Sequence, residues 1–180
     1  HWIAMQCGDG KPLGARRRES SRATAALVRD AARAVAYANE RGVVHRDLKP
    51  DNLMVEDRAT GPHVYVMDFG LARPTEGASD FSISGSIVGT PSYMPPEQAV
   101  GKRADARSYV YALGATLYDV ITGRPPHRGS QPLEVVNRVV NEDPVRPRQL
   151  DPSVDADLET IALKCLEKES ANRYRSAEAL

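Results

Sequence analysis

An apolar stretch from Val110 to Ile121 constrains the fold of this chain more than any other feature of its sequence. The stretch is apolar on nearly every side of a helix, and such a helix is stable only where other elements surround it. Gly123 follows, with Pro125 and Pro126 beyond it, as is typical just after a helix C-terminus. The chain has 180 residues, of which 41% are hydrophobic and 27% charged, so it can bury this helix in the core of one domain.

Helical periodicity also occurs on both sides of this central stretch. Between Leu27 and Ala38, apolar residues recur on one helical face, and Gly42 stands where a helix C-cap would fall. Later in the chain the pattern predicts helices over residues 133–140 and 158–166, and a last one that begins at Ser176. We therefore expect a mostly helical domain.

The remaining patterned segments are short enough to be strands. Strand-sized apolar pieces occur at residues 2–5, 43–44, 53–55 and 64–67. Gly8, Gly10 and Pro12 indicate a loop after the first piece, and a turn at residues 60–62 predicts a hairpin from the last two. Residues 70–97 are rich in Gly, Ser, Thr and Pro, and a loop of that length inside a domain is usually functional. The fold class predicted from these patterns is α+β, with short β-hairpins that hold loops.

Charge and cysteine content exclude several classes of function. Lys plus Arg (24) balance Asp plus Glu (24), so no field of one sign indicates nucleic acid or a membrane surface as partner. The two cysteines, Cys7 and Cys165, lack metal-ligand spacing and favour a reducing cytoplasm. No apolar run approaches the roughly 20 residues of a membrane span. We expect a cytoplasmic chain without a membrane segment of its own, and the alternative is the cytoplasmic part of a larger membrane-anchored protein. His1 in place of Met indicates a piece of a longer chain.

Polar residues suited to phosphate chemistry gather in the loop from His45 to Asn52, between two strand-sized pieces. The carboxylate of Asp47 can orient and deprotonate a hydroxyl, and the amine of Lys49 can neutralise a phosphoryl oxygen. The amide oxygen of Asn52 is a hard ligand for Mg²⁺, and Asp68, before the turn-forming Gly70, supplies a hard carboxylate. The set predicts metal-assisted transfer of an anionic group.

These motifs resemble the eukaryotic-type protein kinase family. The pattern H-R-D-L-x-x-x-N is complete at residues 45–52, and D-F-G is complete at residues 68–70. The resemblance implies a protein-kinase-like fold in which residues 11–180 form the helical C-lobe, with a catalytic loop at 45–52 and an activation segment at 68–97. Residues 1–10 would be the last strand and the hinge of an N-lobe that is otherwise missing.

The resemblance also implies roles for these residues with ATP and Mg²⁺ as cofactors. Asp47 is the catalytic base, Lys49 contacts the transferred phosphate, and Asn52 and Asp68 hold Mg²⁺. Met54 forms part of the floor under the adenine. The gatekeeper and hinge positions that contact ATP are Met5, Gln6 and Gly8. The residues of the H-R-D and D-F-G motifs with a structural or regulatory role are His45, Arg46, Phe69 and Gly70.

The segment from Gly89 to Glu97 resembles the family's substrate-docking segment, which ends in A-P-E. By that resemblance Thr90 contacts Asp47 and Lys49, and Glu97 pairs with Arg173. Arg46 marks the kinases that are activated by phosphorylation in this loop. The residues expected to be autophosphorylated are Ser82 and Ser84.

Three departures from the family pattern bear on activity. No Gly-rich loop, strand Lys or partner Glu precedes His1. Tyr109 stands where the family has a buried Asp that accepts backbone N–H bonds, and Pro95 replaces the Ala of A-P-E. We therefore expect residues 1–180 alone to show no measurable kinase activity.

The predicted reaction is transfer of the γ-phosphoryl of MgATP to Ser or Thr of a protein, because Lys two positions after the catalytic Asp is the Ser/Thr pattern. One alternative is a pseudokinase or truncated remnant that binds a partner, and another is a small-molecule phosphotransferase. The docking segment at 90–97 argues against the latter. Dimerisation through the absent N-lobe is an open expectation.

Several smaller features have unremarkable interpretations. Residues 17–20 resemble a basic-directed phosphorylation site, but we favour a solvated helix start. His1, His63 and His127 are expected on the surface, and Cys7 is expected to be an apolar filler near the hinge rather than a reactive thiol.

Overall fold

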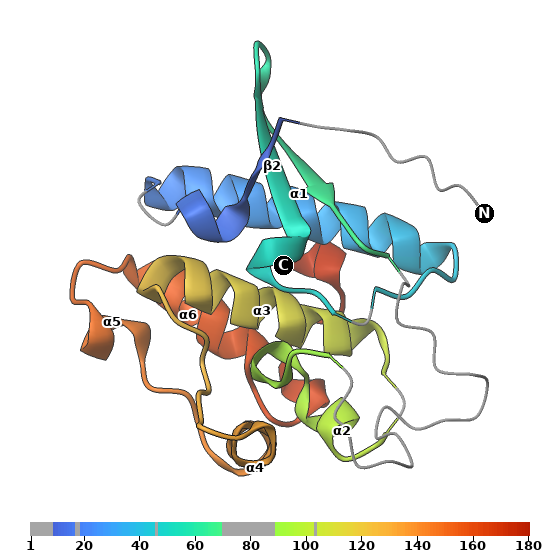
Figure 1. Cartoon of the computed structure of the whole chain (residues 1–180), viewed down its shortest axis with the longest axis vertical. Coiled ribbons are helices and arrows are strands. Elements are labelled where there is room, and N and C mark those ends of the chain that lie inside the picture. The colour runs from blue at the N-terminus through green and yellow to red at the C-terminus, as the bar shows by residue number, and fades with distance from the viewer. Residues whose placement is uncertain (1–8, 17–18, 46, 70–88, 103) are drawn as a thin grey trace.

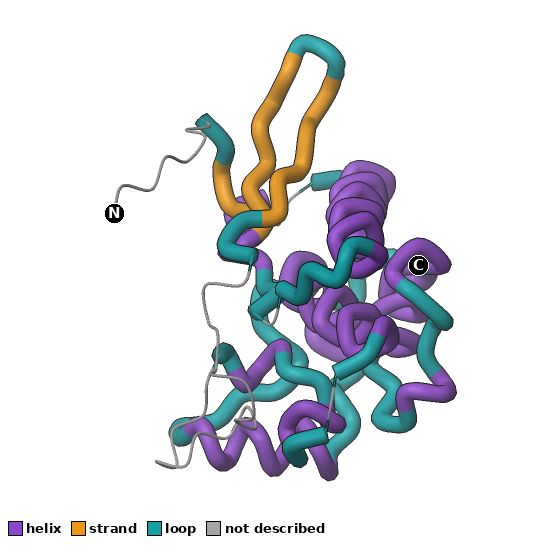
Figure 2. Tube along the Cα trace, turned by 90° about the vertical axis from the view of Figure 1, so that its right-hand side faces the viewer, coloured by secondary structure: helices purple, strands orange, loops and turns teal. Residues whose placement is uncertain are grey.

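The computed structural model describes residues 9–16, 19–45, 47–69, 89–102 and 104–180. A small antiparallel sheet stands at one end of these residues, and the helices fill the other end (Figures 1 and 2). Helix α1 (Ser21–Glu40) lies next to the sheet, and α3 (Ala106–Thr122) runs through the middle of the helical part. The α+β architecture agrees with the predicted fold class.

Helix α3 is the central core helix that the apolar stretch predicts. Every residue from Ser108 to Val120 is buried. The Asp105 carboxylate caps its start by accepting from the backbone N–H groups of Arg107 and Ser108, and Gly123 ends it with a φ of 78°. A Cβ at Gly114 would lie 2.2 Å from the Cβ of Cys165, so only glycine lets α6 (Ala156–Cys165) pack this close.

Helix α1 is fixed at both ends by local sequence. Ser20 is its N-cap, and the Ser20 hydroxyl accepts from the backbone N–H of Ala23 at 3.2 Å. At the other end Gly42 has a φ of 74°, and its N–H bonds the carbonyl of Asn39 at 2.9 Å. The N–H of Val43 bonds Ala38 at 3.0 Å, which completes a Schellman motif. The helix-start interpretation of Ser20 is confirmed.

The sheet has the order β1-β2-β3, with β1 at Lys11–Pro12, β2 at Leu53–Arg58 and β3 at Gly61–Val66. β2 and β3 form the predicted hairpin, with Leu53 opposite Val66. The prediction of a loop at Pro12 was wrong, because residues 11–12 pair with Val55 and Met54. The strand expected at 43–44 does not form in the described part of the chain, because Val43 and Val44 directly follow the helix cap and pair with no strand.

Short helices make up the rest of the described chain. The α-helices are α2 (Pro96–Ala99), α4 (Pro132–Asn141), α5 (Pro147–Leu150) and α6. The 3₁₀ turns are Leu13–Arg16, Pro50–Asn52, Pro91–Tyr93, Ser170–Asn172 and Ala177–Ala179. The helix expected from Ser176 is therefore a single 3₁₀ turn. The strand expected at residues 2–5 lies outside the described residues, and none of the described helices has the length and apolarity to cross a membrane.

His127 is buried, so the expectation of a surface residue was wrong. It is 4% exposed, and its Nε2 lies 3.3 Å from the Nζ of Lys168. Burial first, and then the charges of Lys168 and Arg138, lower the pKa of His127 to about 4. The ring is therefore neutral at pH 7. His63, in contrast, is exposed as expected.

Candidate active site

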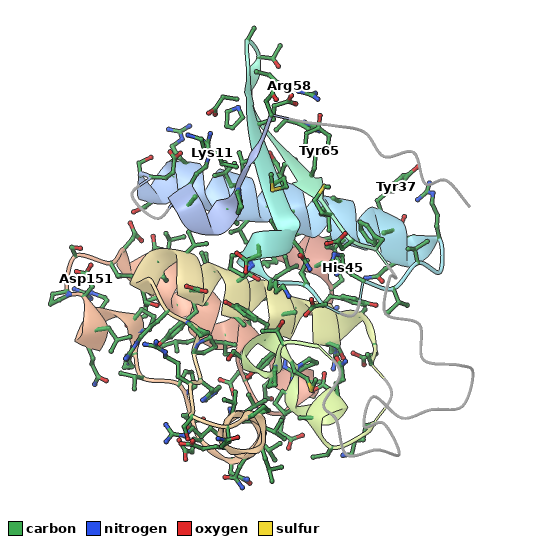
Figure 3. All side chains as sticks on the ribbon, viewed as in Figure 1. Lys11, Tyr37, His45, Arg58, Tyr65 and Asp151 are labelled. Atoms are coloured by element: carbon green, nitrogen blue, oxygen red, sulfur yellow. The ribbon has the colours of Figure 1, made fainter. Side chains whose placement is uncertain are left out.

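The loop that begins at His45 is held against the end of the β-hairpin. The His45 ring is 2% exposed, and its Nε2 lies 2.6 Å from the carbonyl oxygen of Met67. The ring also meets that of Phe69 edge-on, with centroids 4.8 Å apart. Figure 3 shows His45 in the layer between α1 and α3. Burial lowers the pKa of His45, so a neutral imidazole donates from Nε2 to Met67 and joins the two predicted motifs.

Asp47 is the most heavily bonded side chain of the loop. Its Oδ2 accepts from the Nζ of Lys49 at 2.7 Å, and its Oδ1 accepts from the backbone N–H of Thr90 at 3.2 Å. Burial acts to raise the pKa of Asp47, but the bonds from Lys49 and Thr90 outweigh it and hold the pKa below the ordinary value. Asp47 is therefore a carboxylate at neutral pH, as a general base must be.

Lys49 connects the loop to the later segment. Its Nζ donates to the hydroxyl Oγ1 of Thr90 at 2.9 Å as well as to Asp47. Gly89 makes this approach possible, because its φ of 100° is a conformation that side chains with a Cβ rarely adopt. The contacts predicted between Thr90 and both Asp47 and Lys49 are thus confirmed, whereas their catalytic role stays a prediction.

Asn52 and Asp68 are brought together by the register of the hairpin. Leu53 pairs with Val66, and the N–H of Met67 donates to the carbonyl of Asn52 at 2.8 Å, so Asp68 follows immediately beyond this bond. The Nδ2 of Asn52 donates to the backbone carbonyl of Asp47 at 2.7 Å. That bond leaves the amide oxygen on the other side of the group. Asp68 is exposed and has a φ of 59°, a strained conformation that Asp tolerates better than most residues.

The side-chain oxygens of Asn52 and Asp68 are of the kind that could hold Mg²⁺, and their role as ligands stays a prediction. Magnesium typically uses one or two protein carboxylates and fills the remaining positions with water and substrate phosphates. Within the described ranges no group of three or more His, Cys, Asp or Glu side chains forms an all-protein cage. An amide oxygen on Asn52 and a solvent-exposed carboxylate on Asp68 fit an ion that arrives with a nucleotide.

The ion pair predicted between Glu97 and Arg173 is present and bidentate. Nη1 and Nη2 of Arg173 each lie 2.8 Å from a carboxylate oxygen of Glu97. The other donors reach the carbonyls of Glu167, Lys168 and Arg107 at 2.7, 2.9 and 3.2 Å. The Arg173 side chain is fully buried, yet all its donors are satisfied, so the end of the docking segment is fixed to α3 and to the C-terminal turns.

The two substitutions noted in the sequence occupy different settings. Pro95 precedes α2 and accepts from the N–H of Ala99 at 3.0 Å, a position where the helix needs no donor from Pro95. Tyr109 is 8% exposed and belongs to the hydrophobic core, where the family pattern has an acid. Pro95 is therefore accommodated at no cost to α2, whereas Tyr109 exchanges a charged acceptor for an aromatic ring.

Several contacts of the site were not predicted from the sequence. Gly89 lies beside Asp47, Ser108 donates to Glu97 at 2.7 Å, and the Tyr111 ring lies 5.0 Å from the Arg173 guanidinium carbon. The approach of Gly89 to Asp47 had a signal in the sequence, since a Gly at the start of the docking segment indicates a special backbone conformation. The other two depend on tertiary packing.

Met54 lies on β2 with a half-buried side chain, and its place under an adenine stays a prediction. The remaining candidate residues lie outside the described part of the chain. These are Met5, Gln6, Gly8, Arg46, Gly70, Ser82 and Ser84.

Comparison with known proteins gives a consistent result. The family model of the protein kinase domain matches residues 2–180. Serine/threonine-protein kinase PknB of Mycobacterium leprae is 42% identical over 151 residues, which are 84% of this chain and 24% of that protein. PknB of Mycobacterium tuberculosis is 41% identical over 152 residues, with the same coverage. A probable serine/threonine-protein kinase of Streptomyces coelicolor is 38% identical over 148 residues, 82% of this chain and 22% of that protein. The chain thus spans about a quarter of the length of the curated relatives it matches.

Proposed function

Because this chain belongs to the protein kinase family and its relatives are bacterial Ser/Thr kinases, we propose that it transfers the γ-phosphoryl group of MgATP to Ser or Thr of proteins. The observation that carries the proposal is the position of the Lys49 amine. It lies 2.7 Å from the Asp47 carboxylate and 2.9 Å from the Thr90 hydroxyl. A base, a cation for phosphate and the protein-docking segment therefore meet at one point.

Each side chain has a task in the proposed transfer. Asp47 orients the acceptor hydroxyl and takes its proton as the oxygen–phosphorus bond forms and ADP leaves. Lys49 places a positive charge beside the transferred group. Asn52 and Asp68 would hold Mg²⁺, which neutralises phosphate charge when bound. Because these groups are fixed before substrate arrives, the rate gain comes from positioning and electrostatics.

Protein, rather than a small molecule, is the proposed acceptor because the docking segment is firmly built. Thr90 is tied to Asp47 at the start of the segment, and Glu97 is tied to Arg173 at its end. Between them the Tyr93 hydroxyl donates to Asp119 on α3. A platform held at three points suits an extended polypeptide acceptor.

A second candidate function, partner binding without catalysis, is favoured by Tyr109. The Tyr109 hydroxyl is a neutral and therefore weaker acceptor than the carboxylate of the family pattern, and the ring is buried, so the catalytic loop would lose part of that support. The two candidate functions, phosphoryl transfer and partner binding without catalysis, can be told apart by joining this chain to the remaining segments of a kinase and measuring phosphate transfer.

The test is a hybrid kinase in which residues 2–180 replace the matching segment of the Mycobacterium leprae relative. We expect it to phosphorylate myelin basic protein with MgATP. Asp47→Asn should abolish transfer, whereas Asp51→Asn, which changes an exposed carboxylate on the same loop, should leave most of it. A folded hybrid that is inactive, but gains activity with Tyr109→Asp, would favour the second candidate. The expectation that residues 1–180 alone are inactive stays a prediction.

A further inference from the structure

The hydroxyl of Ser108 joins the start of α3 to the end of the docking segment. Its Oγ lies 2.7 Å from Oε1 of Glu97 and 3.0 Å from the backbone nitrogen of Asp105. Ser108 is 3% exposed, so water does not compete for these bonds. The contact with Glu97 was not expected from the sequence, because Ser108 and Glu97 lie on different helices.

The direction of both bonds follows from their partners. The Glu97 carboxylate can only accept, so the single hydroxyl proton of Ser108 goes to it. A lone pair of the same oxygen then accepts the N–H of Asp105. The chain from Asp105 through Ser108 to Glu97 is therefore polarised in one direction, and each bond strengthens the next.

The Glu97 carboxylate accepts side-chain hydrogen bonds from two residues, Arg173 and Ser108, among the described residues. Its Oε1 accepts from Nη1 of Arg173 and from Ser108, and its Oε2 accepts from Nη2 of Arg173. Arg173 supplies charge, but it lies in the C-terminal turns. The Ser108 hydroxyl connects this carboxylate to the Asp105 cap of the central helix, whereas Arg173 connects it to the carbonyl of Arg107 in the first turn of that helix.

We infer that Ser108 is a positioning residue for protein substrates. It acts through Glu97, which ends the segment whose first member, Thr90, bonds Asp47. The inference rests on the proposed kinase function, since it assigns Ser108 to the site that receives the protein acceptor. Asn52 and Asp68 are not part of this chain of bonds, so nucleotide binding is independent of Ser108.

The first test measures the pKa of Glu97 in residues 1–180 by carbon-detected NMR titration. Burial acts to raise this pKa, whereas the bonds from Arg173 and Ser108 lower it below the ordinary value. Ser108→Ala should therefore raise the pKa of Glu97, and Ser108→Thr, which keeps the hydroxyl, should restore it. Ser108→Cys has nearly the shape of serine and a weak donor, so it should give an intermediate value and replaces Ser108→Ala if that variant does not fold.

The matched control is Ser153→Ala. Ser153 is exposed and also donates its hydroxyl to a carboxylate, that of Asp151 at 2.6 Å, but it lies between α5 and α6. The Ser153→Ala variant should leave the pKa of Glu97 unchanged. An unchanged Glu97 pKa in Ser108→Ala, or the same shift in Ser153→Ala, overturns the inference.

The second test uses the hybrid kinase. Ser108→Ala should raise the KM for a protein substrate by about tenfold, near the lower end of what a hydrogen bond to a charged group contributes, and leave the KM for ATP unchanged. Equal increases in both values would overturn the positioning role. The hybrid with Ser108 intact could transfer no phosphate while Ser108→Ala still raises the pKa of Glu97. That result would contradict the proposed kinase function but not the bond between Ser108 and Glu97.

Discussion

The amine of Lys49 lies 2.9 Å from the hydroxyl of Thr90, although 41 positions separate the two residues in the sequence. This bond closes the loop that carries Asp47 onto the segment proposed to bind protein substrate. The same threonine also donates its backbone N–H to the Asp47 carboxylate at 3.2 Å, so Thr90 influences the pKa of Asp47.

Thr90→Val should raise the pKa of Asp47. The side-chain bond from Thr90 is among the interactions that lower this pKa, so its removal lets the opposing effect of burial show more strongly. NMR titration of the Asp47 carboxyl carbon in residues 1–180 measures the change. Thr160→Val, an exposed change on α6, is the control and should have no effect. A pKa that stays constant in Thr90→Val would contradict the predicted coupling.

Two tyrosines of α3 should respond in opposite ways to loss of their hydroxyls. The Tyr111 hydroxyl is buried without a hydrogen-bond partner among the described residues, whereas that of Tyr118 donates to the carbonyl of Val145 at 2.8 Å. Tyr111→Phe should therefore leave the free energy of unfolding unchanged or raise it slightly. Tyr118→Phe should lower it by about 1–2 kcal/mol. Urea denaturation of each variant makes the comparison, and equal losses would argue against these assignments.

Arg173→Lys should destabilise the chain by about 2–4 kcal/mol, since a lysine cannot make the bidentate pair with Glu97 or reach three carbonyls at once. Arg175→Lys is the matched control, because Arg175 is exposed two residues later and should change stability by less than about 0.5 kcal/mol. Chemical denaturation monitored by circular dichroism suffices. A loss no greater than that of the control would mean that the buried pair contributes little.

His127 should make the fold sensitive to mild acid. Its pKa is near 6.5 in the unfolded chain and about 4 in the fold, so the unfolded state binds the extra proton first as the pH falls. The stability that depends on the neutral ring is complete above pH 6.5 and is lost between pH 6.5 and 4. From pH 7 to pH 5 the parent chain should lose about 1–2 kcal/mol more than His127→Gln. His63→Gln, at an exposed position, should lose as much as the parent chain does.

The sequence was most informative where local rules decide the structure. The largely apolar helix at 106–122, the Ser20 cap with the Gly42 Schellman motif, and the hairpin at 53–66 follow from periodicity and turn residues. The family motifs likewise predicted the contacts of Thr90 with Lys49 and of Glu97 with Arg173.

Features decided by tertiary packing were missed. The two-residue strand β1 has no pattern of its own, and it exists only because β2 lies beside it. The single-turn helices α2 and α5 are too short for a periodic signal, and the proline at the start of each is also typical of loops. His127 is buried beside Lys168, which lies 41 residues away, and no local pattern reveals this contact.

The central claim is that Asp47, Asn52 and Asp68 surround one metal-bound nucleotide. It is tested most directly by adding ATP with Mn²⁺, a paramagnetic substitute for Mg²⁺, to residues 1–180 and recording amide NMR spectra. We predict ATP-dependent line broadening concentrated at residues 47–53 and 66–69. It should vanish in Asp68→Ala and persist in Asp157→Ala, an exposed carboxylate on α6. Broadening that is absent from these two segments, or that survives in Asp68→Ala, would contradict the account.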